Sequence, residues 1–257
     1  MKTFTTVVRY DDVSKDLDIY IKEELLKNGF TVDEVSPSIV IVIGGDGTFL
    51  HAVHERIEEL DKVKFYGIHT GTLGFFTDYR SDQVDEFIND LINKKPFITD
   101  YQLLEATVDD NKKYYAVNEI RIENISRTQV IDVFVNETEF ETFRGTGMCV
   151  STQLGSTAYN RSLHGSVIQE GLPLIQLSEI AGIHHKAYRS LGASIVMKEN
   201  TKIEFKSDNF SGAYLCADAY NYPIDNVNKI DVILCEKRVK MLKFKEISYF
   251  KRLQSLF

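Results

Sequence analysis

A run of five β-branched residues, Ile39 to Ile43, is the feature that most narrows the possible folds of this chain. Such unbroken runs are typical of parallel strands buried on both faces, because helices cover both sides of a parallel sheet. The run leads directly into the glycine-rich segment Gly44 to Thr48, and apolar residues at helical spacing follow. We therefore expect a strand, a tight turn and a helix in that order, as in an open α/β sheet.

The same alternation of strand and helix extends over residues 1–96. Strands are expected at 3–10, 39–43 and 64–68, and a segment with apolar residues every three or four positions follows each one. The three stripes of predicted buried residues are Val13, Leu17, Tyr20, Ile21 and Leu25, then Leu50, Val53, His54, Ile57 and Leu60, then Val84, Phe87, Ile88 and Leu91. Asn28-Gly29 ends the first predicted helix, and Pro96 follows the third.

From Phe97 onward, short strands and polar turns replace this alternation. Hairpins are expected from 103–108 with 114–117 and from 130–135 with 139–144, because polar turn residues separate the paired runs. Further strands are expected at 195–197, 202–205, 213–216, 230–235 and 239–244. We therefore expect an α/β domain over 1–96 and a β-rich domain over 97–257, with the C-terminal tail packing back on the first domain.

Charge and cysteine usage exclude several classes of protein. With 38 acidic and 30 basic residues the net charge is −8, which argues against a protein that coats nucleic acid. The run at 39–43 is far shorter than the roughly 18 residues of a membrane span, and the N-terminal segment turns acidic too early for a secretion signal. Cys149, Cys216 and Cys235 are widely spaced and form no CxxC pair. We expect a cytoplasmic protein with no zinc site and no nucleic-acid or membrane partner.

The segment Gly44-Gly45-Asp46-Gly47-Thr48 carries the clearest chemical signal. Glycines between a strand and a helix allow a phosphate to approach backbone N–H groups, and the helix N-terminus favours an anion. The segment matches neither a Walker A loop nor a GxGxxG fingerprint. A carboxylate among phosphate-binding glycines needs a chemical reason, such as removal of a proton from an attacking hydroxyl. The alternative is an Asp-Gly turn in which Thr48 caps the helix.

Two further segments are rich in small polar residues. The first, Ser151 to Ser162, contains hydroxyl residues, a Tyr and few bulky aliphatic residues, which suits a pocket wall that binds a base and a ribose. The second is the pair Asn118-Glu119, whose amide and carboxylate can bind an adenine edge and ribose hydroxyls. The alternatives are an ordinary loop that leads into a helix and a turn at the end of a strand.

Taken together and in order, these segments resemble the NAD kinase family. The matching pieces are GGDGT at 44–48, HTGTLGFF at 69–76, NE at 118–119, FRGTG at 143–147 and STQLGSTAYNRS at 151–162. The resemblance implies transfer of the ATP γ-phosphate to the adenosine 2′-hydroxyl of NAD. It also implies a Rossmann-like N-terminal domain, a β-sandwich-like C-terminal domain and a homotetramer. Since phosphoryl transfer requires charge neutralisation, Mg²⁺ is expected to arrive with ATP, and no dedicated metal site is expected.

The resemblance also implies roles for individual residues. Asp46 is the expected general base. The expected phosphate-binding residues are Gly44, Gly45, Gly47, Thr48 and His51. The expected NAD contacts are Asp46, Gly47, Phe75, Asn118, Glu119, Arg144, Thr146, Thr157, Ala158, Tyr159, Asn160, Arg161, Ser162, Ala181 and Asp218. His51 occupies a position where relatives often have a basic residue, and the alternative is a solvated helix histidine.

Two departures from the family pattern stand out. Thr146 occupies a position where the family commonly has Asp, and Ala219 follows Asp218 where many relatives have His. Two alternative functions also fit part of the sequence. The GGDGT segment is shared with diacylglycerol and sphingosine kinases, so it does not by itself exclude a lipid kinase. A nucleotide-binding sensor without catalysis is the third reading, and Asp46 argues against it because a sensor gains nothing from a carboxylate near phosphates.

Overall fold

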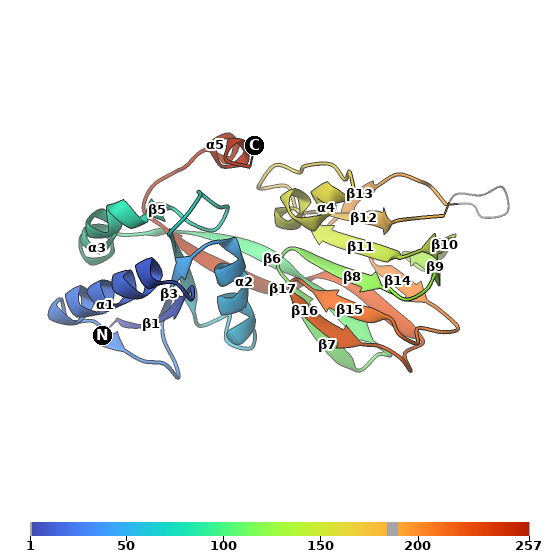
Figure 1. Ribbon diagram of the computed structural model, residues 1–257, viewed down its shortest axis with the longest axis horizontal. Helices are drawn as coiled ribbons and strands as arrows, with labels where there is room; N and C mark the ends of the chain where they lie inside the picture. The colour runs from blue at the N-terminus through green and yellow to red at the C-terminus, as the bar shows by residue number, and fades with distance from the viewer. Residues whose placement is uncertain (1, 184–189, 257) are drawn as a thin grey trace. The chain divides into compact units, whose positions relative to one another are not determined.

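The computed structural model describes residues 2–183 and 190–256, and the chain divides into two compact units (Figure 1). The first unit comprises the residues up to Tyr101 together with those from Lys237 onward. The second unit comprises Gln102–Glu236. Two long strands, β6 (Phe97–Val108) and β17 (Lys229–Lys243), belong partly to each unit, whereas a single boundary after residue 96 was expected from the sequence.

The first unit is an α/β layer structure. Its elements are β1 (Thr3–Val8), α1 (Asp12–Lys27), β2 (Thr31–Val32), β3 (Ile39–Gly44), α2 (Asp46–Glu55), β4 (Lys64–His69), β5 (Tyr79–Arg80), the 3₁₀ helix η1 (Ser81–Gln83), α3 (Val84–Asn93) and α5 (Tyr249–Gln254). The strands lie in the order β2-β1-β3-β4, all parallel, with β5 and the end of β17 also parallel to β4. This arrangement confirms the predicted α/β fold of the N-terminal part.

Both faces of β3 are buried, as the β-branched run predicts. Ile39, Ile41 and Ile43 share a core with residues of α1 and α3, such as Ile21 and Phe87. Val40 and Val42, which lie between these isoleucines, point to the opposite face of the sheet because side chains alternate along a strand. Helix α2 also packs on β3 but contributes no residue to that core, so it covers this second face (Figure 1). The helices therefore lie on both sides of the sheet, which is the Rossmann-like arrangement.

The buried stripe of α1 differs from the predicted one. Val13 is 55% exposed and Tyr20 is also exposed, whereas Ser14 is fully buried. The helix cap explains the difference at its first turn, because the carboxylate of Asp11 accepts hydrogen bonds from both the backbone N–H and the hydroxyl of Ser14 at 2.9 Å. The hydroxyl of Tyr20 donates to Asp85 at 2.7 Å on the outside of the helix pair.

Helix α2 is shorter than predicted. It ends at Glu55, so Ile57 and Leu60 lie in the turns that follow it. The buried residues of α2 are Phe49, Ala52 and Val53. Of the predicted stripe, Val53 and Leu60 are buried, but Leu50, His54 and Ile57 are only half-buried.

The second unit consists of two sheets. Its elements are β6 (Phe97–Val108), β7 (Lys112–Ala116), β8 (Glu119–Glu123), β9 (Gln129–Val135), β10 (Thr138–Gly145), β11 (Gly147–Thr152), the 3₁₀ helix η2 (Leu154–Thr157), α4 (Tyr159–Ser162), β12 (Leu174–Ile180), β13 (Ile195–Lys198), β14 (Ile203–Lys206), β15 (Tyr214–Ala217), β16 (Tyr220–Pro223) and β17 (Lys229–Lys243). One sheet has the order β13-β12-β11-β8-β15-β16. The other contains β10-β9-β14-β17, with β6 beside β17 and β7 beside β6.

A single apolar core joins the two sheets. It contains Phe143 and Phe205 from the sheet of β10 and β14, together with Ile122 and Val150 from the sheet of β8 and β11. Alternate residues along each strand point into this core and the others face outward. The second unit is therefore a β-sandwich, and the predicted β-sandwich-like fold is confirmed.

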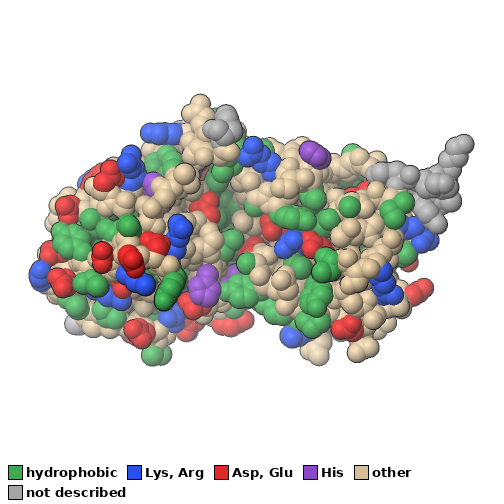
Figure 2. Space-filling model, in the orientation of Figure 1, with side chains coloured by type: hydrophobic (Ala, Val, Ile, Leu, Met, Phe, Trp, Pro, Cys, Tyr) green, Lys and Arg blue, Asp and Glu red, His purple; other side chains and the backbone are tan. Residues whose placement is uncertain are grey.

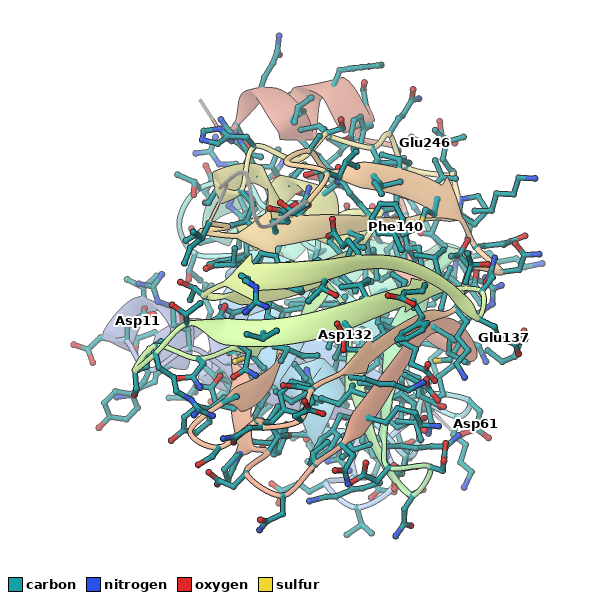
Figure 3. The ribbon with its side chains drawn as sticks, turned by 90° about the vertical axis from the view of Figure 1, so that its right-hand side faces the viewer. Asp11, Asp61, Asp132, Glu137, Phe140 and Glu246 are labelled. Atoms are coloured by element: carbon teal, nitrogen blue, oxygen red, sulfur yellow. The ribbon has the colours of Figure 1, made fainter. Side chains whose placement is uncertain are left out.

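The two predicted hairpins are present in the sandwich. Strand β6 pairs with β7 from Val108, and β9 pairs with β10 from Val135. Glu137 and the residue before it both have positive φ, 66° and 47°, and Glu137 lies at the outer end of its hairpin (Figure 3). Such conformations are typical of two-residue type I′ hairpin turns.

One further prediction was wrong in the sandwich. The strands expected at 230–235 and 239–244 form one continuous strand, β17. The residues between the two expected strands are charged, and Lys237 donates to Glu58 at 2.9 Å and Arg238 to Asp100 at 2.9 Å. These charges are satisfied at the surface of an unbroken strand.

Candidate functional site

The glycine-rich segment forms the junction between β3 and α2. Gly45 is the N-cap residue of α2, and no side chain caps this helix end. A Cβ at Gly44 would collide with the Thr48 side chain, so glycine is needed there for close packing. The first backbone N–H groups of α2 are left without side-chain acceptors, which is the arrangement that binds phosphate.

Asp46 is the first residue of α2, and its carboxylate is held by a second loop. One oxygen accepts the backbone N–H of Phe75 at 3.0 Å, and the other accepts that of Phe76 at 3.2 Å. Burial raises the pKa of Asp46 above its ordinary value, although these two N–H groups and the nearby Arg252 and His69 favour the ionised form. A carboxyl with a raised pKa, fixed beside a phosphate-binding helix end, is suited to accept a proton.

The loop that carries Phe75 packs closely on Asp46 and on α2. Phe76 is buried and its ring stacks on Phe49 of α2, with 4.5 Å between the ring centroids. A Cβ at Gly74 would collide with the carboxylate of Asp46. Phe75 itself is half-buried, and its ring lies 5.8 Å from that of Tyr249 in α5. The predicted residue Phe75 is thus brought next to the predicted base through its backbone.

His51 lies one turn into α2 and is exposed. Its Nε2 atom is 3.4 Å from an Oε1 atom of Glu55, four residues further along the helix. Gly47 is also exposed, while Gly45 and Thr48 are half-buried. Gly44, Gly45, Gly47 and Thr48 therefore lie at the N-terminal end of α2, whereas the ring of His51 lies further along the helix beside Glu55.

In the second unit, Asp218 organises the backbone around Asn118 and Glu119. The carboxylate of Asp218 accepts the backbone N–H groups of Val117 and Asn118, both at 2.8 Å, and that of Glu119 at 3.2 Å. Asp218 is buried and has a positive φ of 52°, and its own N–H donates to the carbonyl of Glu119 at 3.0 Å. It fixes the turn that carries the other two predicted residues.

Glu119 is a buried carboxyl with incomplete hydrogen bonding. It is only 6% exposed, and its Oε2 atom has no hydrogen-bond partner among the residues that the structure describes. Burial, followed by the negative charge of Asp218, raises its pKa to about 8, although Arg121 opposes this shift. The Arg121 guanidinium lies 4.4 Å from the centroid of the Tyr159 ring and donates to Glu123 at 2.6 Å. The carboxyl of Glu119 is therefore suited to donate hydrogen bonds to sugar hydroxyls or to accept them.

The segment from Thr157 to Ser162 surrounds this turn. Thr157, Ala158 and Tyr159 are half-buried, and Arg161 and Ser162 are exposed. The side chain of Asn160 is fully buried and accepts the hydroxyl of Ser178 at 2.9 Å. A Cβ at Gly155 would collide with the backbone of Asn118, so the two polar segments pack directly together. The buried amide of Asn160 thus holds the segment from Thr157 to Ser162 in place through Ser178.

The remaining predicted residues lie where the chain passes from β10 to β11. Thr146 lies between these strands, and its backbone donates to Ile180 at 3.0 Å and accepts from Asn124 at 2.8 Å. The carbonyl of Arg144 accepts the N–H of Ile183 at 2.7 Å. Ala181 is exposed with a positive φ of 47°. Arg144, Thr146 and Ala181 therefore form a second group within the sandwich.

Sequence reasoning missed several residues that shape these groups. Arg121 and Ser178 contact predicted residues in the second unit, and His69 and Arg252 lie near Asp46 in the first. Their sequence positions match none of the pieces at 118–119, 143–147 or 151–162. His69 begins the piece HTGTLGFF, so only this residue had a signal in the sequence.

The rest of the described chain adds few chemical features. Within residues 2–183 and 190–256, no cluster of three or more His, Cys, Asp or Glu side chains could hold a metal ion. None of the helices in this part of the chain is long and apolar enough to cross a membrane. Figure 2 shows one face, on which basic and acidic side chains are interspersed.

Comparison with known proteins places the chain in a family. Residues 2–96 match the model of the ATP-NAD kinase N-terminal domain, and residues 117–244 match that of the ATP-NAD kinase C-terminal domain. NAD kinase 1 of Halalkalibacterium halodurans is 36% identical, with 99% of this chain and 98% of the relative covered. A NAD kinase of Streptococcus pyogenes is 39% identical over 89% of this chain and 84% of the relative.

Two solved structures share the fold. The yeast NADH kinase complexed with NADH matches with a TM-score of 0.81 at 17% identity, over 100% of this chain and 87% of that one. A NAD kinase from Archaeoglobus fulgidus in complex with ATP matches with a TM-score of 0.79 at 21% identity, over 99% of both chains. At these identities the structures support the fold, and the family assignment follows from the sequence matches. The chain belongs to the ATP-NAD kinase family.

Proposed function

We propose that this chain transfers the γ-phosphate of ATP to the 2′-hydroxyl of the adenosine ribose of NAD, giving NADP and ADP. The observation that carries the proposal is the position of Asp46, a partly desolvated carboxylate at the uncapped N-terminus of α2. Membership of the family supports it, as do relatives that are themselves NAD kinases over nearly the whole chain.

The proposed reaction needs one proton acceptor and a fixed phosphate. Asp46 accepts the proton of the 2′-hydroxyl while the hydroxyl oxygen forms a bond to the γ-phosphorus, and the bond from that phosphorus to the bridging oxygen of ADP breaks. The N–H groups at the start of α2, with Gly44, Gly45, Gly47 and Thr48, hold the phosphates. His51 lies on the next turn, where it can approach the phosphates from the helix surface.

We place the NAD contacts on the second unit and on Phe75. Asn118, Glu119 and Tyr159 offer an amide, a carboxyl and a ring for the base and the sugars. Asp218 and Asn160 support these contacts indirectly. The Asp218 carboxylate accepts a backbone N–H, and the Asn160 amide accepts the hydroxyl of Ser178. The further proposed contacts are Arg144, Thr146, Thr157, Ala158, Arg161, Ser162 and Ala181.

A divalent cation fits this chain only as a partner of the nucleotide. The described residues offer Asp46 alone near the phosphate-binding helix end and no three-ligand cluster, so we propose that Mg²⁺ arrives with ATP. When bound, it would neutralise the charge on the transferring phosphate. Chelation with EDTA is then expected to abolish turnover and leave the thermal unfolding temperature of the protein unchanged.

We further propose that the chain acts as a homotetramer in the cytoplasm. The resemblance to the family supports the assembly, and three buried cysteines that form no disulfide among the described residues suit a reducing compartment. Light scattering coupled to gel filtration is expected to give four times the chain mass of 29.4 kDa. A mass of one or two chains would contradict the assembly and leave the activity proposal intact.

The experiment that tests the function is an assay of the purified protein with ATP and NAD, with NADP separated by chromatography. Asp46→Asn is expected to lower kcat by roughly 10²- to 10⁴-fold, the usual contribution of a general base, while NAD still binds. Diacylglycerol and sphingosine in place of NAD are expected to give no phosphorylated product. Full kcat in the Asn variant would show that Asp46 is not the base, and a phosphorylated lipid would favour a lipid kinase.

A further inference from the structure

A buried arginine contacts the loop that holds Asp46. Arg252 lies on α5 and is only 2% exposed, and its guanidinium forms an ion pair with the equally buried Asp78. It also donates to the carbonyl of Gly74 at 3.0 Å and to that of Thr77 at 2.6 Å. Burial of a charge is costly unless hydrogen bonds satisfy it. All three acceptors of this charge belong to one short segment, residues 74–78.

The same segment binds Asp46 through its N–H groups. The peptide group between Gly74 and Phe75 is shared, because its carbonyl accepts from Arg252 and its N–H donates to the Asp46 carboxylate. The carbonyl and N–H of a trans peptide point in opposite directions. The guanidinium and the carboxylate therefore lie on opposite sides of one peptide group. Each polarises it in the direction that strengthens the other hydrogen bond.

One side of this loop packs on α2 through Phe76, and open space adjoins the segment before it. A cavity of about 650 Å³ borders it, lined among others by Gly71, Leu73 and Lys251. Two further contacts from the C-terminal residues reach the loop: the hydroxyl of Ser255 donates to the carbonyl of Leu73 at 2.9 Å, and Tyr249 packs on Phe75. These hydrogen bonds add to the packing of Phe76 on Phe49 in fixing the position of the loop.

We propose that Arg252 is a positioning residue for phosphoryl transfer, which fixes the loop of residues 74–78 so that its N–H groups orient the Asp46 carboxylate. This rests on the proposed function, in which Asp46 is the general base. Arg252 itself contacts neither substrate in this proposal. Its loss is therefore expected to lower kcat more strongly than it raises KM for NAD, which Phe75 of the same loop contacts in the proposed function, and to leave KM for ATP nearly unchanged.

The first test compares Arg252→Lys with the parent protein. Lys keeps the positive charge beside Asp78, but one ammonium group lacks the planar fork that reaches Gly74, Thr77 and Asp78 together. We expect kcat to fall by 10-fold or more, and the backbone N–H groups of residues 75 and 76 to exchange hydrogen at least 10-fold faster. Arg238→Lys is the matched control, because Arg238 forms a half-exposed ion pair with Asp100 in the same unit. It is expected to change neither quantity.

The second test is a double-mutant cycle with Asp46→Asn. If Arg252 acts through Asp46, Arg252→Lys is expected to lower kcat by less than twofold in the Asp46→Asn background. Equal losses in both backgrounds would overturn the proposal, as would unchanged exchange at residues 75 and 76. If Arg252→Lys does not fold, Ser255→Ala replaces it. That residue is exposed, and faster exchange at 74–76 with a smaller fall in kcat is expected.

The two proposals fail in different ways. If the parent protein makes no NADP, the proposed function fails, and hydrogen exchange still tests whether Arg252 fixes the loop. If the parent protein is active and Asp46→Asn is inactive, the function stands. Additive losses, or an Arg252→Lys protein with the parent kcat, would then refute the positioning role alone.

Discussion

The carboxyls of Asp46 and Glu119 are both removed from water, but their hydrogen bonds differ. Asp46 accepts two backbone N–H groups, which favour its ionised form against the effect of burial. Glu119 has an oxygen without a hydrogen-bond partner among the described residues, and its pKa is raised to about 8. The Asp46 carboxyl suits proton acceptance at neutral pH. The Glu119 carboxyl keeps its proton until the pH approaches its raised pKa.

At Gly74 a single methyl group tests the position of the base. Because a Cβ there would collide with the Asp46 carboxylate, Gly74→Ala is expected to displace it and to lower kcat on the order of 10²-fold, with little change in KM. Gly71→Ala in the same loop is the matched control, since its nearest atom, on Arg9, is 3.9 Å away. Steady-state kinetics measures both variants, and equal kcat values would contradict the steric argument.

For Glu119, the raised pKa predicts a pH dependence of stability. A group with a higher pKa in the folded state stabilises the fold below its unfolded pKa, and this contribution is lost as pH rises towards the folded value. Between pH 4.5, the ordinary pKa of a glutamate, and a pH of about 8, the free energy of unfolding should fall by up to about 1.4 kcal/mol per pH unit through this group. Glu119→Gln is expected to remove that slope.

Urea unfolding at several pH values between 5 and 8.5 measures this effect. The comparison variant is Glu137→Gln, because Glu137 is exposed at a hairpin turn and its loss should leave the slope as it is. A parallel pH profile for Glu119→Gln and the parent protein would show that Glu119 is ionised in the folded state throughout this range.

At the scale of elements, the sequence predicts those features that depend on neighbouring residues. The run Ile39 to Ile43 forms a buried strand, and the polar turn at Asn136-Glu137 forms a hairpin, because both follow from local conformational preference. The burial of Ser14 and the continuity of β17 were not predictable in this way. The Ser14 hydroxyl contacts that of Thr70 at 3.0 Å, and the middle of β17 forms ion pairs between Lys237 and Glu58 and between Arg238 and Asp100. All these partners are far apart in the sequence.

The same limit applies to the candidate site. GGDGT and NE mark the segments that carry it, because glycines and an amide–carboxyl pair have few other uses at such positions. The loop partners of Asp46 and the role of Asp218 as a backbone anchor come from residues about 30 and 100 positions away. No local sequence pattern predicts contacts between residues so far apart, so these contacts are seen only in the folded chain.

The hairpin turn between β9 and β10 gives a prediction at the scale of an element. Glu137 has a φ of 66°, which costs an L residue about 1 kcal/mol and costs glycine almost nothing. Glu137→Gly creates the Asn-Gly pair preferred in type I′ turns and is expected to raise the free energy of unfolding by roughly 0.5 kcal/mol. Asn136→Gly is expected to give no gain, because Asn136 accepts the N–H of Lys202 at 2.9 Å. Denaturant unfolding of both variants tests this contrast.

For the whole molecule, the two units divide the chain differently from its order along the sequence. The first unit needs the residues from Lys237 onward, which add a strand beside β4 and buried side chains such as Met241 and Leu242. The sequence-based boundary after residue 96 leaves these residues out. A cut at that point removes one edge of the parallel sheet.

This division predicts how fragments behave. A fragment of residues 1–101 joined to 237–257 by a linker of about six residues is expected to unfold cooperatively on heating, because its core is complete. Residues 1–96 alone are expected to lack a cooperative transition. Circular dichroism with heating compares the two, and a cooperative transition in the shorter fragment would show that the C-terminal segment is dispensable for folding.

The position of Arg252 also affects the order of events during synthesis. Asp46 and its loop leave the ribosome early, but the arginine that fixes the loop is added more than 170 residues later. The residues of β1 to α3 are all synthesised long before the base acquires its final orientation. If the positioning role holds, a chain whose synthesis stops short of α5 would bind phosphate at α2 and still catalyse poorly, so incomplete copies would carry little activity into the cell.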